Sequence, residues 1–300
     1  MSAGYKLVVY SILCLIWSST WLMIKVGLAG APPFTAAGIR LIIASFVIFV
    51  ILHRRRIKLP RSAAFYRLSL FLGTIQMGAA YGLVYWGEQY ISSGLAAILF
   101  SSMPLLVAIL ARLFVGESLS PAKVAGILLG VAGVYVIFSD SVALGGPQSV
   151  YGITAVLGSV LCTSVSTVTI KKYATEYHPF AAMSLPVFIG GIILAVCGLL
   201  FERDRPVDWN YTTIFSILYL AVFGSVIAFG LYFWIIKHIE VTVLSYQTFL
   251  LPIIAGVLGW IFLGETVTLR VVIGGSMILA GIALAILTRA RIKRHDVAGP

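Results

Sequence analysis

The sequence predicts an all-α polytopic membrane protein with ten transmembrane helices, arranged as two inverted five-helix repeats, and three observations predict it. The 300 residues are 60% apolar and only 10% charged, with a mean hydropathy of +1.05, whereas globular domains carry about 25% charged residues. Apolar runs of about 20 residues, the length that crosses a bilayer, follow one another along the chain. The two halves also repeat one pattern of prolines and glycines.

The ten predicted spans are separated by short connections, and their ends carry ordinary helix signals. Ser120-Pro121 places a capping residue and then a proline at the first helical position, and Thr268 can cap the last span in the same way. Pro32-Pro33 and Pro179 mark two further junctions. The spans are 5–28, 34–52, 66–90, 94–115, 120–139, 150–172, 179–201, 211–236, 242–263 and 268–288.

Positive charge gathers on one side of the predicted bundle. If the N-terminus is cytoplasmic, the cytoplasmic side receives the basic segments at 53–61 (HRRRIKLPR) and 289–295 (RARIKRH). Cytoplasmic loops of membrane proteins are enriched in Lys and Arg, so we expect both termini in the cytoplasm and an even number of spans. The opposite side receives Lys25, Arg40, Arg203, Arg205 and Arg270.

The net charge of +11 does not indicate nucleic-acid binding. The basic residues lie between or beside apolar runs, where they set membrane orientation and attract lipid headgroups. HExxH, GxSxG and P-loop motifs are absent, so we expect no enzyme, no cofactor and no metal. The expected partners are a small-molecule substrate and membrane lipid, with the chain as a monomer or homodimer. Gly126-x3-Gly130 fits helix packing within the chain or a dimerisation face.

An internal duplication aligns the two halves at an offset of 148 residues. Tyr81–Trp86 falls on Phe229–Trp234, and at an offset of 146 Pro33-Phe34 falls on Pro179-Phe180. Five spans per copy is an odd number, so the second copy enters the membrane in the opposite sense, as recurs in secondary transporters. The first repeat covers 1–140, the second 150–288, and a basic cytoplasmic tail 289–300. The matched motif residues are Pro104, Gly116-Glu117, Gly126 and Gly133 with Pro252, Gly264-Glu265, Gly274 and Gly281.

These motifs resemble a known family. The first span carries Trp17-Ser18-Ser19 and Lys25, the second carries Pro32-Pro33-Phe34 and Arg40, and the Pro…Gly-Glu…Gly…Gly unit is doubled. Together they resemble the EamA-type branch of the drug/metabolite transporter (DMT) superfamily over essentially the whole chain, and within it the YddG-like amino-acid exporters. The resemblance implies ten helices, cytoplasmic termini and a substrate cavity between the halves.

Helical periodicity and side-chain chemistry select candidate substrate residues. Met77, Tyr81, Tyr85 and Glu88 recur on one face of the third span, and hydroxyl residues form stripes along the first and sixth. Polar faces of membrane helices point at other helices or at water, so these stripes fit either a pathway or tight helix contacts. The candidate substrate-binding residues are Trp17, Ser18, Met77, Tyr81, Tyr85, Ser101, Thr163, Ser166, Phe229, Tyr232, Phe233, Ser245, Tyr246 and Thr248.

Pro104 and Pro252 are candidate helix breaks inside the fourth and ninth spans. Each lacks an N–H and frees the carbonyl four residues earlier, at Phe100 and Thr248, which fits a wet cavity or an ordinary packing kink. The two Gly-Glu pairs are interpreted as structural turns rather than proton sites.

Glu88 and Lys25 remain as the candidate coupling groups, and so little fixed charge suits a net-neutral, amphipathic solute. We therefore predict a secondary transporter that exports amino acids, aromatic or hydrophobic ones, by alternating access across the bacterial inner membrane. Proton-driven and facilitated transport both remain open. A general drug or metabolite exporter and a membrane enzyme or scaffold are the rival functions.

Overall fold

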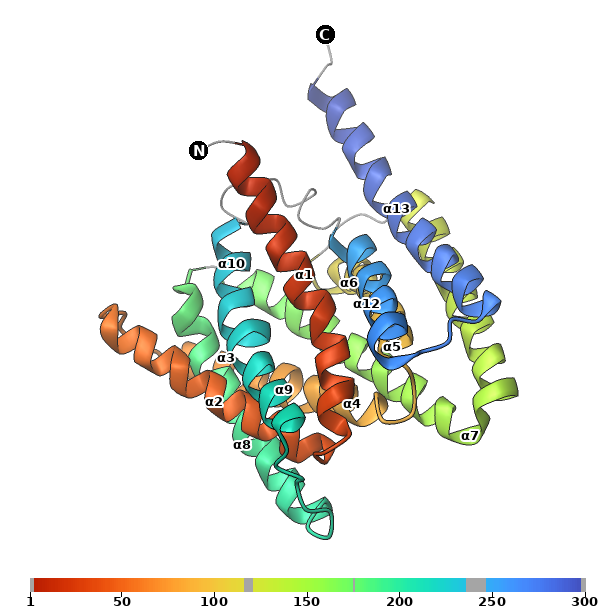
Figure 1. Ribbon diagram of the computed structural model, residues 1–300. Coiled ribbons are helices and arrows are strands. Elements are labelled where there is room, and N and C mark those ends of the chain that lie inside the picture. The colour runs from red at the N-terminus through yellow and green to blue at the C-terminus, as the bar shows by residue number, and fades with distance from the viewer. Residues whose placement is uncertain (1–2, 116–120, 175, 236–246, 298–300) are drawn as a thin grey trace.

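The computed structural model describes residues 3–115, 121–174, 176–235 and 247–297, and every regular element among them is a helix. Figure 1 shows these helices packed into one bundle. In the described part of the chain, seven stretches are long and apolar enough to cross a membrane. Three shorter apolar helices, Val124–Val136, Ile253–Leu263 and Leu269–Gly281, lie within the fifth, ninth and tenth predicted spans. The prediction of an all-α polytopic membrane protein is confirmed.

The first half of the chain contains two simple spans and two composite ones. The first two spans are continuous helices, α1 (Ala3–Leu28) and α2 (Pro33–Arg54). The third span consists of α3 (Ala63–Leu72), the π-helix η1 (Gly73–Ala80) and α4 (Tyr81–Gly87). The fourth span consists of α5 (Ser93–Phe100) and α6 (Met103–Val115).

The fourth span is interrupted at Ser101 and Ser102, directly ahead of Pro104. The two serine hydroxyls donate hydrogen bonds to the carbonyls of Ile98 and Leu99, both at 2.7 Å. These side-chain bonds give additional donors to carbonyls at the end of α5, where regular helical bonding stops. The interruption therefore lies just before the proline that the sequence singles out.

The helix α7 (Pro121–Tyr173) joins the two halves, because it carries both the fifth span, the last of the first repeat, and the sixth span, the first of the second. After it come α8 (Pro179–Phe201) and a composite eighth span made of α9 (Tyr211–Ala221), the π-helix η2 (Val222–Ile227) and α10 (Ala228–Ile235). The chain ends with α12 (Gln247–Leu263) and α13 (Leu269–Val297). Thr268 caps α13 as predicted, because its Oγ1 accepts from Val271 N at 3.2 Å.

Three boundaries correct the expectation from the sequence. Residues 140–149, predicted as a connection, are helical within α7, where the ribbon bends sharply (Figure 1); Ala143 and Leu144 favour the helix. The predicted break at Pro252 is absent, since α12 continues through it; this proline lies near the helix start and removes one hydrogen bond. α13 extends to Val297 rather than ending at 288, because its Arg- and Lys-rich end consists of helix-forming residues.

The two π-helices lie at equivalent positions of the duplication. Adding the offset of 148 to η1 gives residues 221–228, and η2 covers Val222–Ile227. A π segment inserts an extra residue into a helix, and such segments are frequent at functional sites. The third and eighth spans thus share a local backbone distortion as well as a sequence pattern.

Helices α7 and α13 approach each other at the repeated glycines (Figure 1). A Cβ on Gly133 would lie 2.5 Å from the carbonyl oxygen of Gly274, and a Cβ on Gly281 would lie 2.4 Å from that of Gly126. Glycines that let two membrane helices meet backbone to backbone are a common packing device. The face that contains Gly126 and Gly130 therefore packs within the chain.

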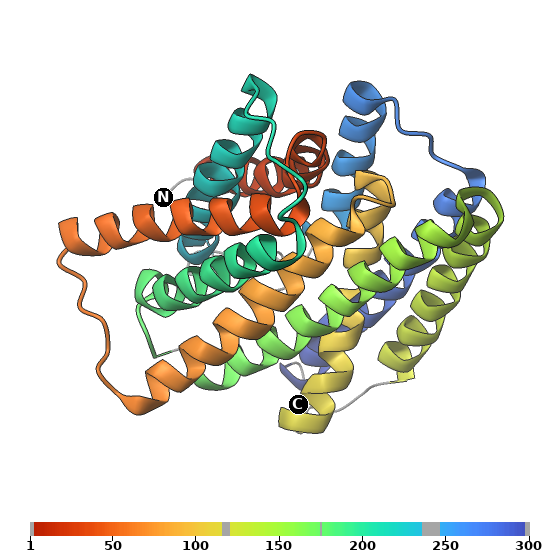
Figure 2. The same ribbon diagram turned by 90° about the horizontal axis from the view of Figure 1, so that it is seen from below.

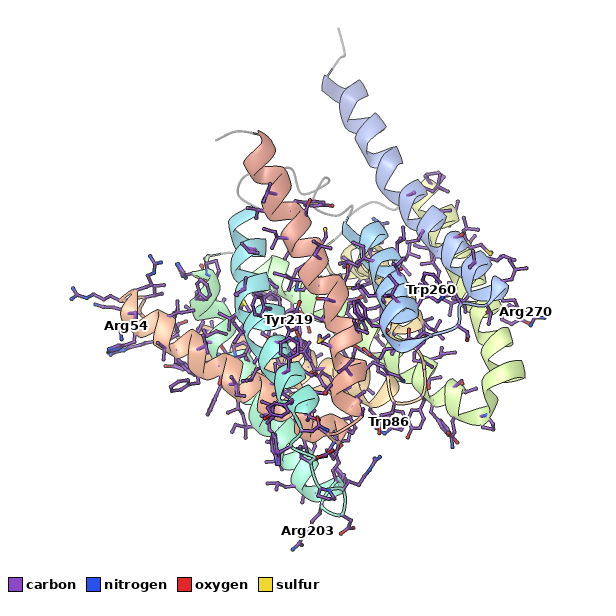
Figure 3. The ribbon with its side chains drawn as sticks, viewed as in Figure 1. Arg54, Trp86, Arg203, Tyr219, Trp260 and Arg270 are labelled. Atoms are coloured by element: carbon purple, nitrogen blue, oxygen red, sulfur yellow. The ribbon has the colours of Figure 1, made fainter. Side chains whose placement is uncertain are left out.

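Helices α2 and α8 form a second close pair that joins the two halves (Figure 2). A Cβ on Gly38 would lie 2.7 Å from the backbone nitrogen of Ala195. The outer surfaces of such pairs carry large exposed apolar residues, among them Leu199 and Phe201 at the end of α8. Charged residues such as Arg54 and Arg203 lie at helix ends (Figure 3). This distribution fits a bundle surrounded by lipid.

Glu202, directly after α8, caps the N-terminus of α2. Its carboxylate accepts hydrogen bonds from Phe34 N, Thr35 N and Thr35 Oγ1, each at 2.8 Å. The first N–H groups of a helix have no partner within the helix and carry partial positive charge, so a carboxylate stabilises them. Glu202 is 6% exposed, which keeps water from replacing these bonds.

We predict that Glu202→Ala lowers the stability of the folded protein by about 1–3 kcal/mol, the cost of leaving charge-assisted hydrogen bonds unmade. Thermal unfolding in detergent, followed by size-exclusion chromatography, measures this effect. Arg203→Ala, a change at the neighbouring exposed residue, is the control and should leave the unfolding temperature unchanged. Equal unfolding temperatures for both variants would contradict a capping role.

Candidate functional site

Arg40 on α2 is buried inside the bundle, with 3% of its surface exposed. Its Nε donates a hydrogen bond to Ser225 Oγ at 3.3 Å, and its Nη1 donates to Tyr85 Oη at 3.2 Å. The guanidinium carbon lies 5.1 Å from the centre of the Tyr81 ring, within cation–π distance. Because Ser225 belongs to η2 and both tyrosines belong to α4, this arginine connects the two halves of the chain.

Gly224 leaves space for the guanidinium. A Cβ built on this residue of η2 would lie 3.2 Å from Arg40 Nη2 and 2.8 Å from Thr20 Cγ2 on α1. Both distances are shorter than ordinary van der Waals contacts, so a side chain here would displace the guanidinium or α1. The π-helix η2 therefore presents two adjacent residues to the arginine, a glycine that gives room and a serine that gives an acceptor.

The structure shows how Arg40 and Lys25 lie in their helices, which the sequence-based charge count, assigning both to the same side of the membrane, does not address. Arg40 is buried in α2, and Lys25 is half-buried near the end of α1. The count assigns each charge to the nearer end of a span, so it cannot recognise a charge that points into the bundle. The available signal is that Arg40 interrupts an apolar run, which in membrane helices marks a functional residue.

The two candidate coupling residues, Lys25 and Glu88, contact each other through the backbone carbonyl of Glu88. Lys25 Nζ donates to the carbonyl oxygens of Glu88 and Ile91, the latter at 2.7 Å. It thereby satisfies carbonyls in the turn between α4 and α5. The Glu88 side chain is fully buried, and neither of its carboxyl oxygens has a hydrogen-bond partner among the described residues.

Glu265 caps α5 in the same way that Glu202 caps α2. Its carboxylate accepts from Ser93 N at 2.8 Å, Ser93 Oγ at 3.0 Å and Gly94 N at 3.2 Å. The preceding Gly264 has a φ of +63°, a left-handed conformation that glycine adopts without strain. The second Gly-Glu pair thus forms a structural turn with a capping carboxylate, while its equivalent at 116–117 lies outside the described residues.

The charged residues of this region form a mixed group. Lys25, Glu265 and Arg40 all lie within electrostatic range of Glu88. They come from α1, from the turn between α12 and α13, and from α2. A change in the charge of Glu88 is therefore felt by the other three groups.

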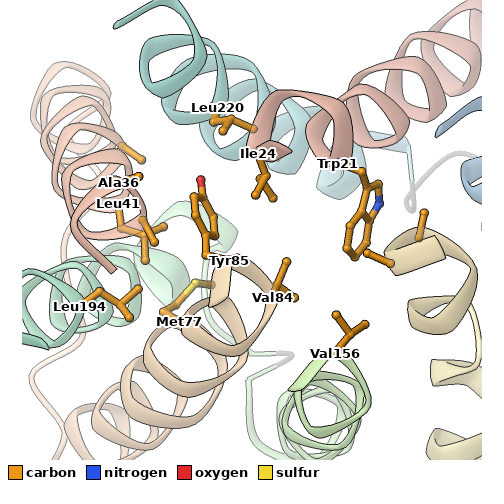
Figure 4. Packing of buried hydrophobic residues seen from close by; sticks show 14 of the residues in the cluster. Trp21, Ile24, Ala36, Leu41, Met77, Val84, Tyr85, Val156, Leu194 and Leu220 are labelled. Carbon is orange, nitrogen blue, oxygen red and sulfur yellow. The ribbon is translucent and has the colours of Figure 1, made fainter. Parts of the chain in front are cut away.

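Aromatic rings from both halves also meet inside the bundle. Trp17 on α1 and Phe229 on α10 meet edge to face, with ring centres 5.9 Å apart. Trp21 packs on Phe100, at the break of the fourth span, at 5.2 Å. Figure 4 shows Trp21 and Tyr85 pointing into the space between the surrounding helices. The structure therefore pairs two predicted residues, Trp17 and Phe229, across the two halves.

Other predicted residues have packing roles or satisfied hydroxyls. Met77 is 5% exposed and packs against α8, where a Cβ on Gly190 would clash with it. The hydroxyls of Ser101 and Ser166 donate to carbonyls of their own helices, those of Ile98 and Cys162. These contacts agree with the alternative that such hydroxyls serve helix structure.

The remaining predicted residues include two hydroxyl positions in described spans. Ser18 is fully buried and its Oγ has no partner in the described part of the chain, whereas Thr163 is half-buried. The structure does not describe the side chains of Tyr232, Phe233, Thr248 and Pro252, and Ser245 and Tyr246 lie outside the described residues altogether.

A cavity of about 500 Å³ lies between α5, α12 and α13. Glu265 and Gly94 line it together with apolar residues such as Ile98 and Val271, and none of the predicted substrate residues does. This cavity therefore adjoins the capped end of α5 and touches the charged group at Glu265, whereas Arg40 does not line it.

Comparisons with known proteins agree with the architecture. The family model described as "EamA-like transporter family" matches residues 5–139 and again residues 150–287. The chain is 29% identical over 289 residues to "Uncharacterized transporter YvbV" of Bacillus subtilis, covering 96% of this chain and 93% of the relative.

Two further similarities span most of the chain. "Uncharacterized inner membrane transporter YedA" of Escherichia coli is 26% identical over 260 residues, which cover 85% of this chain and 82% of the relative. A protein of known crystal structure superposes with a TM-score of 0.67 at 20% identity, over 97% of this chain and 99% of that one. The last similarity concerns the fold alone.

Proposed function

The chain belongs to the EamA-like transporter family and is a multi-pass membrane transporter, and from this premise we propose that it exports small, net-neutral, partly apolar solutes. Amino acids with aromatic or hydrophobic side chains are the proposed class, and the bacterial inner membrane is the proposed location. The observation that carries the proposal is the cluster of Arg40, Tyr81, Tyr85 and Ser225, in which both halves of the chain meet inside the helix bundle.

Alternating access between inverted halves is the proposed mechanism. The turns at Lys25, Glu88 and Glu265 contact one another, and we call this end of the bundle the Lys25 end. α1 ends there, whereas the sixth span begins there, because a Cβ on Gly152 would lie 2.8 Å from Ile91 Cγ2. The first helices of the two repeats, α1 and the sixth span, thus run in opposite directions. This supports an inverted repeat and the exchange of conformations between the halves.

The proposed orientation places both termini in the cytoplasm and the Lys25 end outside. Its support is the arrangement of basic segments, since residues 53–61 and 289–295 both lie at the opposite end of their helices from Lys25. Glu202 and Glu265, both from the second half, then cap the outer ends of two helices of the first half, α2 and α5. In this orientation the protein releases its solute on the side where these capped ends lie.

We predict that purified protein in proteoliposomes exchanges labelled amino acids with aromatic or branched side chains across the membrane, and that empty liposomes do not. The panel should include neutral, acidic and basic amino acids, sugars and hydrophobic cations, each with and without an imposed pH gradient. Flux of a sugar or a hydrophobic cation, with none of any amino acid, would overturn the substrate class and favour the general drug or metabolite exporter.

A further inference from the structure

The side chain of Arg40 is positively charged, but in the described part of the chain it forms hydrogen bonds only with neutral groups. Among the described residues, its hydrogen bonds go to the hydroxyls of Tyr85 and Ser225, and Nη2 makes none. Glu88 is the carboxyl group within electrostatic range of Arg40. Within the described part of the chain, both oxygens of Glu88 lack a hydrogen-bond partner, and no ion pair joins this residue to the arginine.

A guanidinium in a membrane interior is costly unless an anion or many dipoles compensate it. Hydroxyl oxygens supply dipoles but no charge, so the site retains a demand for a negative group. The planar guanidinium matches a carboxylate best, because it can donate two parallel hydrogen bonds to the two oxygens. A carboxylate could take up the free Nη2 and replace one of the two hydroxyls.

An aromatic ring and a glycine lie beside the guanidinium. The ring of Tyr81 is half-buried and can contact the apolar part of such a ligand, and Gly224 places no side chain against Nη2, where a Cβ would lie 3.2 Å away. The Arg40 bond to Ser225 runs from α2 to η2, between the halves that would move in alternating access. A ligand that binds here would therefore be released when these halves separate.

We propose that Arg40 binds the carboxylate of the transported solute, with the hydroxyls of Tyr85 and Ser225 as its substitutes in the unliganded protein. The ligand class is an amphipathic monocarboxylate, and its amino group is dispensable for binding. This inference rests on the proposed function for its biological meaning. It goes further, because it assigns recognition to one end of the solute and predicts that an amine without the carboxylate is not bound.

Binding to the purified protein in detergent tests the inference, with four probes that share one aromatic body. Phenylalanine and 3-phenylpropionate carry the carboxylate, whereas phenylalaninamide and phenethylamine lack it. Isothermal titration calorimetry should detect binding of the two carboxylates. The protein should bind the two probes without a carboxylate at least about tenfold more weakly, as expected for loss of a charge-assisted pair. Comparable affinities for 3-phenylpropionate and phenethylamine, or no binding of either carboxylate, would overturn it.

Variants separate recognition from a structural role of the arginine. Arg40→Gln should abolish the preference for carboxylates, and Arg40→Lys should retain part of it because the charge remains. Gly224→Ala keeps the arginine but crowds Nη2, so it should weaken the two carboxylates and leave the amine and amide unchanged. Arg203→Gln, at an exposed position, is the control. If Arg40→Gln and Gly224→Ala keep the carboxylate preference, the assignment is wrong.

The two levels of the proposal can fail separately. One outcome is that carboxylates bind selectively, that this selectivity depends on Arg40, and that no solute moves in proteoliposomes. This outcome would contradict the proposed transport function but support the binding site. Flux of an aromatic amino acid that is inhibited equally by its amide and by 3-phenylpropionate would keep the function and remove the role of Arg40.

Discussion

Replacing Gly281 by alanine should force α7 and α13 apart and lower the unfolding temperature of the protein. The added Cβ would lie 2.4 Å from the carbonyl oxygen of Gly126 and 3.2 Å from the nitrogen of Gly130. Both are backbone atoms, so no side-chain rotation can relieve the contact. Overpacking of this kind costs about 1–3 kcal/mol, and the helix separation would also loosen neighbouring contacts.

Gly256→Ala is the matched control, because a Cβ at this position of α12 meets no atom within 4 Å. Gly133→Ala should behave like Gly281→Ala, since its Cβ would lie 2.5 Å from the carbonyl oxygen of Gly274. Thermal unfolding of the three variants in one detergent provides the comparison. A Gly281→Ala protein as stable as Gly256→Ala would show that the two helices can separate at no cost.

The glycine contacts also show what the repeat pattern could and could not predict. The offset of 148 relates Gly126 to Gly274 and Gly133 to Gly281. In the structure, however, the equivalent glycines do not face each other. Gly126 lies against Gly281, and Gly133 lies against Gly274. Sequence similarity identifies equivalent positions, but which of them touch depends on how the repeats are placed in space.

The spans were predictable because an apolar run of sufficient length has few alternatives in a membrane. The helical course of α7 through Pro147 was not predicted, since a proline next to two glycines ordinarily indicates a turn. The π-helices η1 and η2 were not predictable either. A single inserted residue changes the hydrogen-bond pattern of a span and leaves its hydropathy unchanged.

Part of the candidate site was predictable, because residues that recur at helical spacing within one span lie on one face of the helix. The spacing of Tyr81 and Tyr85 places both on one face of their helix, and both contact the same guanidinium. The cation that they contact comes from another helix, so no spacing within one span reveals it. Ser225 and Gly224 belong to a π segment, where the rule of 3.6 residues per turn fails.

Replacing Glu88 by glutamine should separate solute movement from the proton gradient. An ionised carboxylate that is fully buried without a donor costs several kcal/mol, so the described conformation favours the neutral acid. Ionisation then requires a conformation in which water or a cation reaches the side chain. Lys25 and Arg40 are the nearby cations, and they stabilise the ionised form once the turn between α4 and α5 moves.

In this scheme Glu88 releases its proton in one conformation and regains it in the other, which couples proton movement to the exchange of the two halves. Glutamine has the shape of the neutral acid and cannot lose a proton. In proteoliposomes, Glu88→Gln should therefore retain exchange of solute against solute and lose the stimulation by an imposed pH gradient. Glu176→Gln, at an exposed carboxylate, should keep that stimulation. Full gradient-driven transport by Glu88→Gln would exclude this residue from coupling, and a wild-type protein indifferent to the gradient would favour facilitated transport.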